Sequence, residues 1–379
     1  MKEFSMNKFL NPSHGGAGGS HKHHYVAIMA GGIGSRFWPM SRTSLPKQFL
    51  DILGTGKTLI QQTFERYSKL VPIENIYVIT AHEYQAVVKK QLPDLPEENI
   101  LAEPSRKNTA PCIAYIAFKL LKKDPKALMI AAPADNLILE TDEFIKTANK
   151  ALSFVDHIDA LVTIGVRPAY PNTGYGYIQH ETAEAAPDVY KVKTFTEKPN
   201  LELAKTFIAS GDFLWNAGIF TWKVKNILAA LEKNEPELYE LFAAEKDKFN
   251  TSKEKQAVEN IYPQCTNISI DFAVMEKADN VFLIPATFGW SDLGTWNSAW
   301  ENKDKDYFGN AVVGKNVVVV DANNCMVHVP DNKLVLLQGM KDYIVVDTKD
   351  VLLICKKEKE QEIKDYVAEV KRNKGDKYL

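Results

Sequence analysis

Residues 25–36, YVAIMAGGIGSR, begin with an apolar run and end in a cluster of glycines followed by an arginine. A short, continuous apolar run that stops at glycine is typical of a strand buried on both faces of a sheet. Glycines allow backbone N–H groups to approach a phosphate closely, and Arg36 adds a positive charge beside them. The stretch therefore predicts a buried strand that leads into a phosphate-binding loop, with an ordinary strand-to-helix turn as the alternative.

The glycines do not fit two common nucleotide-binding patterns. A dinucleotide fingerprint begun at Gly32 needs glycine or a close substitute where Phe37 stands. The later Gly-Lys-Thr, residues 56–58, lacks the first glycine of a P-loop, because Asp51 stands in its place. We expect a turn there that leads into a helix, with Thr58 and Gln61 at capping-box spacing.

Apolar runs and helical patterns alternate along the chain from this strand onward. We expect strands at 25–30, 76–80, 100–102, 127–132, 160–166 and 190–196, and helices at 58–70, 82–90, 108–122 and 144–155, with further helical segments within 199–245. This order predicts an α/β fold that is Rossmann-like, with a mixed, mostly parallel sheet covered by helices on both faces.

The pattern changes after about residue 305. Residues 311–355 are β-branched runs separated by turn residues, and a charged helix is expected over 356–373. The short strands predict a small all-β unit, either a β-helix or a β-roll. We therefore divide the chain into a flexible leader (1–24), a catalytic domain (25–304) and a small β-unit with a terminal helix (305–379).

Composition excludes several classes of protein. The chain has 379 residues, a net charge of −2, 45% hydrophobic and 25% charged residues, which is ordinary for a folded protein. No basic excess favours a nucleic-acid partner, and no apolar run approaches the roughly 20 residues that span a bilayer. Four widely separated cysteines suit a reducing compartment, so we expect a cytoplasmic protein.

Residues 11–24, NPSHGGAGGSHKHH, contain half of the chain's eight histidines. A metal-binding role for His21, His23 and His24 is one interpretation, and a flexible polar leader that includes His14 is the favoured one. The stretch has no apolar core, so it is not a secretory signal.

Blocks that follow the glycine loop extend it into a longer pattern. Residues 37–42 read FWPMSR and residues 45–49 read LPKQF. With them, the chain resembles the sugar-nucleotide pyrophosphorylase family and, within it, the mannose-1-phosphate guanylyltransferases. The other matching blocks are EP at 103–104, NTAP at 108–111, PAD at 133–135, GYGYI at 174–178, FTEKP at 195–199, WNAGIF at 215–220, SIDFAVMEK at 269–277 and GWSDLG at 289–294.

The resemblance implies a nucleotidyltransferase fold of the GT-A-like type and a reaction of GTP with mannose 1-phosphate that yields GDP-mannose and diphosphate. The attacking group is a phosphate whose second pKa is about 6, so it is mostly dianionic at neutral pH. We therefore expect no general base and no covalent intermediate. Cations should instead relieve charge repulsion and align an in-line displacement.

The resemblance also assigns the charged groups of the site. It makes Asp135 and Asp292 ligands of a divalent cation, Mg²⁺ or another, and makes Arg36 and Lys47 partners of the triphosphate. Asp135 ends a predicted strand, where ligands of open α/β sheets gather, and Asp292 could in addition cap a helix at 293–300. The full predicted nucleotide-binding set is Ala30, Gly31, Gly32, Gly34, Ser35, Arg36, Lys47, Asn108 and Asp135.

Asn108 could cap a helix or contact the nucleotide, and both readings stay open. By resemblance, Glu197 binds sugar hydroxyls and Lys198 binds the sugar phosphate. The full predicted sugar-phosphate set is Tyr175, Gly176, Glu197, Lys198, Asn216 and Gly218. The residues alone predict less: a hairpin turn at 174–177, an exposed helix start at 197–199 and a turn at 216–218. The chain departs from the family at Asn136, where His is frequent.

Two alternatives to this enzyme remain. One is a non-catalytic sugar-nucleotide sensor on the same fold, and the other is a related transferase with another base or sugar. Both carboxylates and the arginine of the glycine loop are present, which favours the active enzyme. We expect no cupin-like isomerase domain after the β-unit. The dense apolar runs of the β-unit suggest a role in support or assembly, with a homodimer as the expected assembly.

Overall fold

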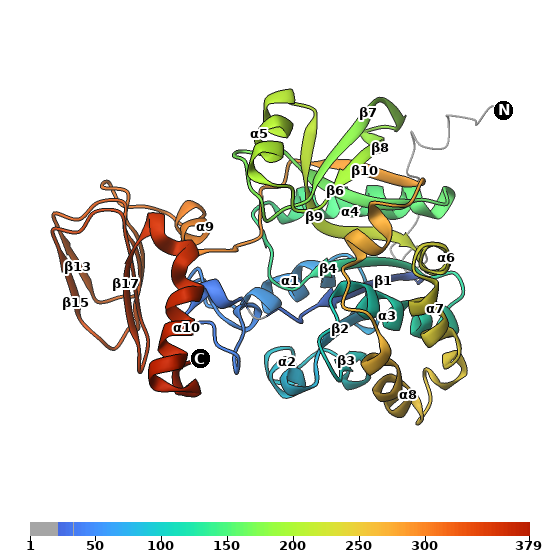
Figure 1. Ribbon diagram of the computed structural model, residues 1–379, viewed down its shortest axis with the longest axis horizontal. Coiled ribbons are helices and arrows are strands. Elements are labelled where there is room, and N and C mark those ends of the chain that lie inside the picture. The colour runs from blue at the N-terminus through green and yellow to red at the C-terminus, as the bar shows by residue number, and fades with distance from the viewer. Residues whose placement is uncertain (1–21, 33) are drawn as a thin grey trace.

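The computed structural model describes residues 22–32 and 34–379. Within these residues, a nine-stranded sheet has the order β3-β2-β1-β4-β9-β6-β10-β8-β7 (Figure 1). Its strands are β1 (His24–Met29), β2 (Ile76–Ala81), β3 (Ile100–Glu103), β4 (Leu128–Pro133), β6 (Leu161–Val166), β7 (Tyr177–Ala186), β8 (Val189–Thr196), β9 (Phe213–Lys223) and β10 (Val281–Ala286).

Helices surround this sheet. They are α1 (Leu59–Ser68), α2 (Gln85–Gln91), α3 (Thr109–Lys123), α4 (Thr141–His157), α5 (Leu201–Ser210), α6 (Val224–Asn234), α7 (Pro236–Ala243) and α8 (Glu254–Ile261). Helices α1 to α7 follow the order that the sequence predicted, whereas α8 was not predicted. The predicted α/β fold, with a mixed and mostly parallel sheet, is confirmed.

The sheet is parallel around β1, where the glycine loop begins, and mixed beyond β4. Strands β3, β2, β1 and β4 run parallel to their neighbours, and β6 runs parallel to β10. Strand β9 lies antiparallel between β4 and β6, at the centre of the sheet. The helical segments expected within 199–245 are present as α5, α6 and α7, but the sequence analysis did not predict β9, the central strand that separates α5 from α6.

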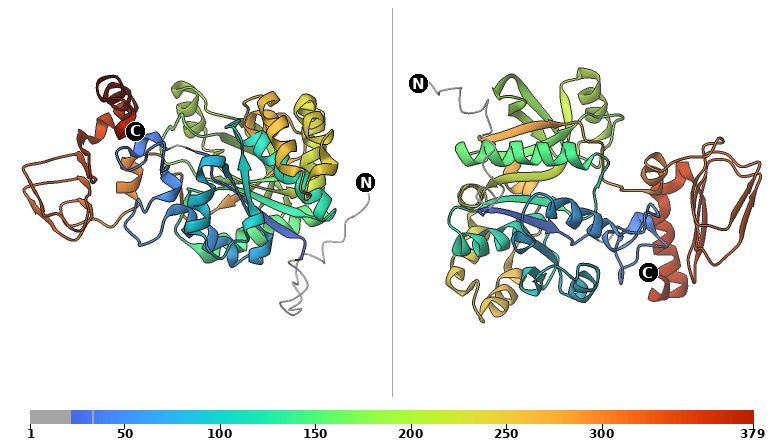
Figure 2. Two further views of the ribbon diagram at one scale, coloured as in Figure 1. Left: turned by 90° about the horizontal axis from the view of Figure 1, so that it is seen from below. Right: turned by 180° about the vertical axis from the view of Figure 1, so that it is seen from behind.

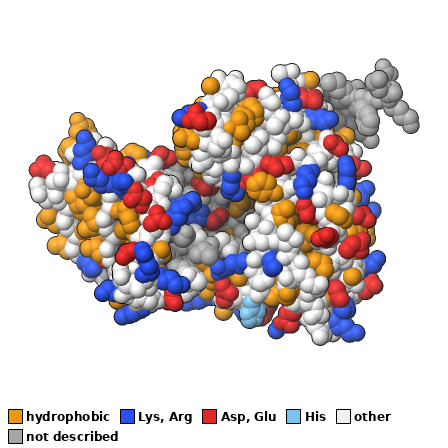
Figure 3. All heavy atoms as spheres, in the orientation of Figure 1, with side chains coloured by type: hydrophobic (Ala, Val, Ile, Leu, Met, Phe, Trp, Pro, Cys, Tyr) orange, Lys and Arg blue, Asp and Glu red, His pale blue; other side chains and the backbone are white. Residues whose placement is uncertain are grey.

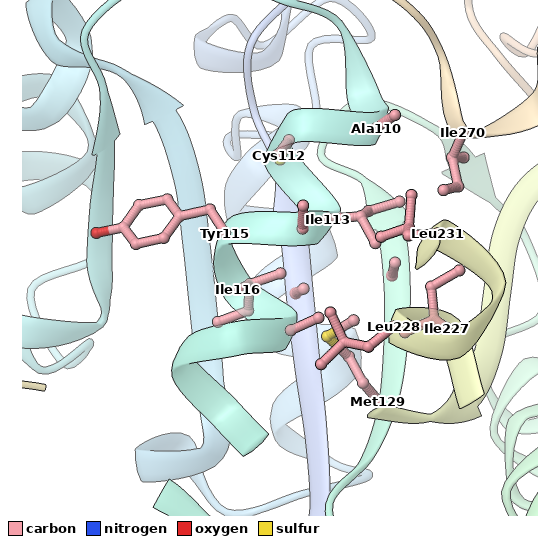
Figure 4. Packing of buried hydrophobic residues seen from close by; sticks show 14 of the residues in the cluster. Ala110, Cys112, Ile113, Tyr115, Ile116, Met129, Ile227, Leu228, Leu231 and Ile270 are labelled. Atoms are coloured by element: carbon pink, nitrogen blue, oxygen red, sulfur yellow. The ribbon is translucent and has the colours of Figure 1, made fainter. Parts of the chain in front are cut away.

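Alternate side chains of β1 enter two hydrophobic cores on opposite faces of the sheet. Tyr25 and Ala27 belong to one core, and Val26 and Ile28 belong to the other. Helices α3, α6, α7 and α8 cover the first face, and α1, α2 and α4 cover the second. Figure 4 shows the first core, where α3 packs against α6 through Ile113, Leu228 and Leu231. This alternation explains why every residue of such a strand is apolar.

The C-terminal strands form a small β-helix. They are β12 (Ala311–Val313), β13 (Val317–Val320), β14 (Met326–His328), β15 (Val335–Gln338), β16 (Tyr343–Asp347) and β17 (Leu352–Lys356). Strands β12, β14 and β16 stack in parallel on one side, and β13 pairs in parallel with β15 on another. Successive parallel stacking identifies a β-helix rather than a β-roll, and β17 closes it as an antiparallel strand.

A shared core joins the β-helix to the segment that follows the glycine loop. Phe37 and Trp38 pack with Trp296 of α9 (Trp296–Glu301), Met326 of β14 and Ile363 of α10 (Ile363–Lys374). The indole N–H of Trp38 also donates to the backbone oxygen of Tyr378 at 2.8 Å. Figures 1 and 2 show α10 between the β-helix and the large body. The C-terminal unit thus supports the loop region.

Two short segments behave as the sequence indicated. The Asp51 carboxylate accepts hydrogen bonds from the backbone N–H groups of Thr55 at 2.9 Å and Gly56 at 2.7 Å, which makes residues 51–56 a turn. Thr58 and Gln61 then form the capping box of α1. The predicted turn and helix cap are confirmed.

The start of the described chain differs slightly from expectation. Strand β1 begins at His24, a residue that the sequence pattern assigns to the leader. His23 Nδ1 lies 2.7 Å from an oxygen of Asp124, while His14 and His21 lie outside the described residues. No helix in the described ranges is both long enough and apolar enough to cross a bilayer.

Candidate functional site

The carboxyl ends of three parallel strands meet at one edge of the sheet. Strand β1 leads into Gly31 and Gly32, β3 ends at Glu103, and β4 leads to Asp135. These residues line a cavity of about 380 Å³. Figure 3 shows this side of the molecule hollowed between the β-helix and the large body, with charged side chains around the hollow. The structure thus brings together five predicted nucleotide-binding residues: Ala30, Gly31, Gly32, Asn108 and Asp135.

Asn108 is both a helix cap and part of the cavity wall. Its Oδ1 accepts a hydrogen bond from the backbone N–H of Thr109 at 2.9 Å, at the start of α3. Its backbone has a φ of 68°, in the left-handed region. A non-glycine residue held in this conformation costs energy and occurs preferentially at functional sites. The cap role is confirmed, and Asn108 also lines the cavity into which the nucleotide is predicted to bind.

Glu103 is a cavity residue to which the sequence analysis gave no role. Its side chain is buried, and Oε1 accepts a hydrogen bond from the Tyr262 hydroxyl at 2.9 Å. Burial raises the pKa of Glu103 to about 7. A Cβ atom on Gly31 would lie 3.7 Å from Glu103 Oε2, so the carboxyl group faces the glycine loop. The Glu-Pro block at 103–104 was the available signal.

Lys47 lies between the two predicted metal ligands. Its Nζ is 3.0 Å from Asp135 Oδ2 and donates to the backbone oxygens of Asp292 at 2.7 Å and Leu293 at 3.0 Å. The side chain is buried in this position. Arg36, in the short helix η2 (Ser35–Phe37), is exposed to solvent. The lysine therefore holds the aspartates, whereas the arginine is accessible to a ligand.

A short two-stranded ladder brings the aspartates together. Strand β5 (Leu137–Ile138) follows Asp135, strand β11 (Trp290–Ser291) precedes Asp292, and the two pair in antiparallel fashion. The indole N–H of Trp290 donates to Asn136 Oδ1 at 3.1 Å. Asn136, which departs from the family pattern, thus helps to fix this ladder.

Asp292 is held by a tyrosine and does not cap a helix. Its Oδ1 accepts hydrogen bonds from the Tyr175 hydroxyl at 2.5 Å and from the backbone N–H of Gly294 at 3.0 Å. Burial and the neighbouring Asp292 raise the pKa of Tyr175, so the phenol stays neutral and donates. The expected cap role is wrong: Thr295 stands directly before α9 and caps it.

The predicted sugar-binding residues converge beyond Tyr175. The backbone oxygen of Tyr175 accepts from the N–H of Lys198 at 3.2 Å, and that of Gly176 accepts from the N–H of Asn216 at 2.8 Å. Residues 174–177 lead into β7 and do not form a hairpin turn. Asn216 and Gly218 lie within β9, so the expected turn there is also wrong.

Glu197 is buried rather than part of an exposed helix start. Its side chain is only 7% exposed, and its Oε1 lies 2.6 Å from Lys198 Nζ. Helix α5 begins four residues later, with Asn200 as its N-cap. Because the glutamate is enclosed by the site, the helix-start interpretation of residues 197–199 is wrong.

A continuous line of contacts therefore crosses the site. It runs from the cavity through Asp135, Lys47 and Asp292 to Tyr175, and from there to the sugar-binding cluster. The carboxylates of Asp135 and Asp292 are hard oxygen donors, which suit Mg²⁺, a cation that phosphate oxygens also ligate. The cavity, the two aspartates and the predicted sugar-binding cluster thus lie in a row. This order fits a nucleotide, a divalent cation and a second small ligand.

The fold and the site define a class of protein that binds a nucleotide at the carboxyl edge of an α/β sheet and places paired carboxylates beside it. The chain belongs to the nucleotidyl transferase family, whose model matches residues 25–307. A second model, described as a MannoseP isomerase/GMP-like beta-helix domain, matches residues 315–370.

Curated proteins extend this result over most of the chain. It is 38% identical over 352 residues to a mannose-1-phosphate guanylyltransferase of Salmonella montevideo, with 91% of this chain and 73% of that protein covered. A mannose-1-phosphate guanylyltransferase of Klebsiella pneumoniae is 36% identical over 356 residues, with coverages of 93% and 74%. The alginate biosynthesis protein AlgA of Pseudomonas aeruginosa is 35% identical, with coverages of 90% and 71%.

A solved structure resembles the whole architecture. The crystal structure of a mannose-1-phosphate geranyltransferase from Thermus thermophilus matches with a TM-score of 0.82 and 28% identity. The match covers 92% of this chain and 99% of the other. The large body and the β-helix therefore recur together in that protein.

Proposed function

We propose that this chain is a mannose-1-phosphate guanylyltransferase, which joins GTP and mannose 1-phosphate to give GDP-mannose and diphosphate. The observation that carries the proposal is the pair Asp135 and Asp292, held by Lys47 between the nucleotide cavity and the cluster around Glu197. Relatives that carry this activity in their names match nine-tenths of the chain, which supports the choice of substrates.

The reaction is a single displacement at the α-phosphorus of GTP. An oxygen of the sugar phosphate forms the new P–O bond, and the bond to the β-phosphate oxygen breaks, so that diphosphate leaves. The attacking oxygen is already ionised near neutral pH, so the protein supplies no base. Its task is to align the two ligands and to offset their mutual repulsion.

Different cationic side chains of the chain carry out different parts of this task. Arg36 is exposed beside the glycine loop and binds the triphosphate, and Lys198 binds the sugar phosphate. The three acceptors around the Lys47 ammonium group belong to the protein, so we assign Lys47 to the positioning of Asp135 and Asp292. Asp135 and Asp292 would hold Mg²⁺, or another divalent cation, which when bound would neutralise charge on the phosphate oxygens.

Glu103 supports the choice of guanine over other bases. Guanine presents two neighbouring N–H donors, N1 and N2, on one edge, and a carboxylate can accept from both. Uracil and thymine present a single N–H flanked by carbonyl oxygens, which a carboxylate repels. A buried carboxyl group facing the glycine loop therefore selects guanine by its donor pattern.

The test is release of pyrophosphate by the purified full chain. Each of the four nucleoside triphosphates is combined with mannose 1-phosphate and with glucose 1-phosphate, in the presence of Mg²⁺. The proposal expects the highest kcat/KM for GTP with mannose 1-phosphate. A higher value for another pair would identify a related transferase, and binding of GDP-mannose without turnover of any pair would identify a sensor.

A further inference from the structure

A second carboxylate lies beside the predicted sugar-binding residues. Asp271 begins a short π-helical turn, η9 (Asp271–Met275), after a segment that lies along the start of α3. In that segment, the backbone N–H of Ile270 donates to the Thr109 hydroxyl at 2.8 Å. The turn thus connects the wall of the nucleotide cavity to the sugar-binding cluster, and π-helical turns occur frequently at functional sites.

Asn216 holds Asp271 in place and has little capacity left for a ligand. Its Oδ1 accepts from the Thr163 hydroxyl at 2.9 Å and from the N–H of Gly218 at 3.1 Å. Its Nδ2 donates to Asp271 Oδ1 at 2.8 Å. Both acceptor positions and one donor of the amide are therefore used within the protein. The arrangement fixes one oxygen of Asp271 and leaves the other for another partner.

Glu197 presents an unsatisfied oxygen in the same cluster. Its Oε2 is buried and has no hydrogen-bond partner among the described residues, although the side chain is only 7% exposed. A Cβ atom on Gly176 would lie 2.5 Å from this oxygen and 3.2 Å from Asn216 Cβ. Glycine at 176 therefore keeps a space beside the carboxylate open. A buried acceptor without a donor is costly unless a ligand supplies the donor.

The two carboxylates influence each other. Burial, together with the negative charge of Glu197, raises the pKa of Asp271 to about 6. Near neutral pH, Asp271 is thus mostly a charged acceptor. Lys198 is the cation that contacts Glu197, and Glu276 accepts from the backbone N–H of Glu197 at 2.7 Å. A neutral sugar ring with several hydroxyl donors relieves this concentration of acceptors.

We propose that Asp271 is a specificity-determining residue that, together with Glu197, accepts hydrogen bonds from hydroxyl groups of the sugar 1-phosphate. Asn216 then acts through Asp271 as a positioning residue. The inference rests on the proposed function, because it places the sugar in this cluster. It adds a sugar contact from a segment to which the sequence analysis gave no role.

The test combines a variant with a series of sugars. Asp271→Asn removes one acceptor, and monodeoxy mannose 1-phosphates each remove one hydroxyl donor. For the wild type, loss of the bonded hydroxyl should lower kcat/KM by about tenfold to a hundredfold, as expected for a hydrogen bond to a charged group. Asp271→Asn should raise KM for mannose 1-phosphate by a similar factor, while KM for GTP stays unchanged.

A hydrogen bond between Asp271 and one sugar hydroxyl should make the effect of Asp271→Asn and the effect of removing that hydroxyl non-additive. Asp271→Asn should lose little further activity on the one deoxy sugar that lacks the bonded hydroxyl, and should lose its full factor on the others. An equal loss on every sugar would mean a general disturbance of the site and would overturn the proposal. If Asp271→Asn does not fold, Asp271→Ser is used in the same series. The matched control is Asp279→Asn, whose side chain is 88% exposed and pairs with Lys233.

Failure of this inference can be distinguished from failure of the proposed function. The wild type is first assayed with several sugar 1-phosphates, and the deoxy series is built on the best substrate. If another sugar 1-phosphate is the best substrate, the proposed function is corrected, and the deoxy series of that sugar still tests Asp271. If no sugar is turned over, the same series is measured by calorimetric binding, where additive losses would again overturn the inference.

Discussion

Lys47, a single residue, determines how Asp135 and Asp292 are held. Its ammonium group lies against the Asp135 carboxylate and against the backbone of Asp292 and Leu293. These contacts join a loop near the N-terminus to a distant segment, because Lys47 and Asp292 are 245 residues apart in the sequence. The lysine thus contacts the carboxylate of Asp135 and the main chain of Asp292, and in this way fixes both residues relative to each other.

The aspartates give the first prediction. Asp135→Asn and Asp292→Asn should each lower kcat by at least about a hundredfold, because each removes a charged oxygen donor to the cation at the phosphates. Neither carboxylate lies in a hydrophobic core, so the melting temperature should change by only a few degrees. Turnover and thermal unfolding are measured in parallel over a range of Mg²⁺ concentrations. Near wild-type turnover at saturating Mg²⁺ would exclude the shared-metal role.

Glu103 gives a prediction about the base and about pH. Inosine lacks the N2 amino group of guanine, so the wild type should prefer GTP over ITP by about tenfold or more, and Glu103→Gln should reduce this preference. Burial raises the pKa of Glu103 to about 7, and guanine N–H donors stabilise its charged form. The preference should therefore be full above pH 7 and shrink as pH falls below it.

The ratio of kcat/KM for GTP and ITP is measured from pH 5.5 to 8.5. Both nucleotides carry the same triphosphate, so phosphate protonation cancels in the ratio. A preference that is independent of pH in the wild type, or that persists in Glu103→Gln, would remove Glu103 from base recognition.

At the scale of elements, the glycine loop is shaped by close contact with Lys47. Gly34 has a φ of 62°, and a Cβ atom there would lie 2.4 Å from Lys47 Cβ. Gly34→Ala should push the lysine away from the aspartates and lower kcat by at least about tenfold. Gly56→Ala is the matched control, because Gly56 has a φ of 85° but nothing within 4 Å of its Cβ position.

Both substitutions place alanine in the left-handed region, which costs about 1 kcal/mol of stability. Only Gly34→Ala should also reduce turnover. Steady-state kinetics and chemical unfolding of the two variants separate the effects. Equal turnover in both would show that contact with Lys47 does not matter for catalysis.

The elements that were predictable from sequence are those whose residues serve only the core. Strands β1, β2, β4 and β6 are nearly continuous apolar runs because helices cover both of their faces. Strand β9 was missed because Asn216, Ala217 and Gly218 interrupt its apolar run. Gly218 has a φ of 69°, and the pairing with β6 changes register here. The interruption exists because the strand contributes Asn216 to the site.

The sequence predicted which residues belong to the site better than it predicted which contacts these residues make. The motif blocks named Asp135, Asp292, Lys47 and Glu197, which the structure brings together. Local sequence could not show that Lys47 faces the aspartates, because these contacts join segments that pair only in the folded sheet. Glu103 and Asp271 were missed for a related reason: Glu103 lies buried beside a cavity and Asp271 contacts Asn216 of a distant strand, and both arrangements depend on segments far apart in the sequence.

At the scale of the whole molecule, the β-helix has one face in contact with the large body and another that is free of it. The first supports the glycine loop through Trp38 and its neighbours. Strands β13 and β15 lie at the end of the molecule remote from the body (Figure 1). Their exposed apolar side chains are Val318, Val320 and Leu336, and the exposed Leu334 directly precedes β15. Val318 and Leu336 are direct neighbours in the parallel ladder, so the patch is continuous.

An apolar sheet face of this kind is unfavourable in water, and we expect a second copy of the chain to cover it in a symmetric homodimer. Leu336→Lys places a charge at the centre of the patch, where the residue is 63% exposed, so it should produce monomers without loss of folding. Leu352→Lys, on β17 outside the patch, is the matched control because Leu352 is 58% exposed. Light scattering at micromolar concentration gives the mass of each protein. A monomeric wild type would leave the β-helix with only its supporting role, and a dimer that persists in Leu336→Lys would place the interface elsewhere.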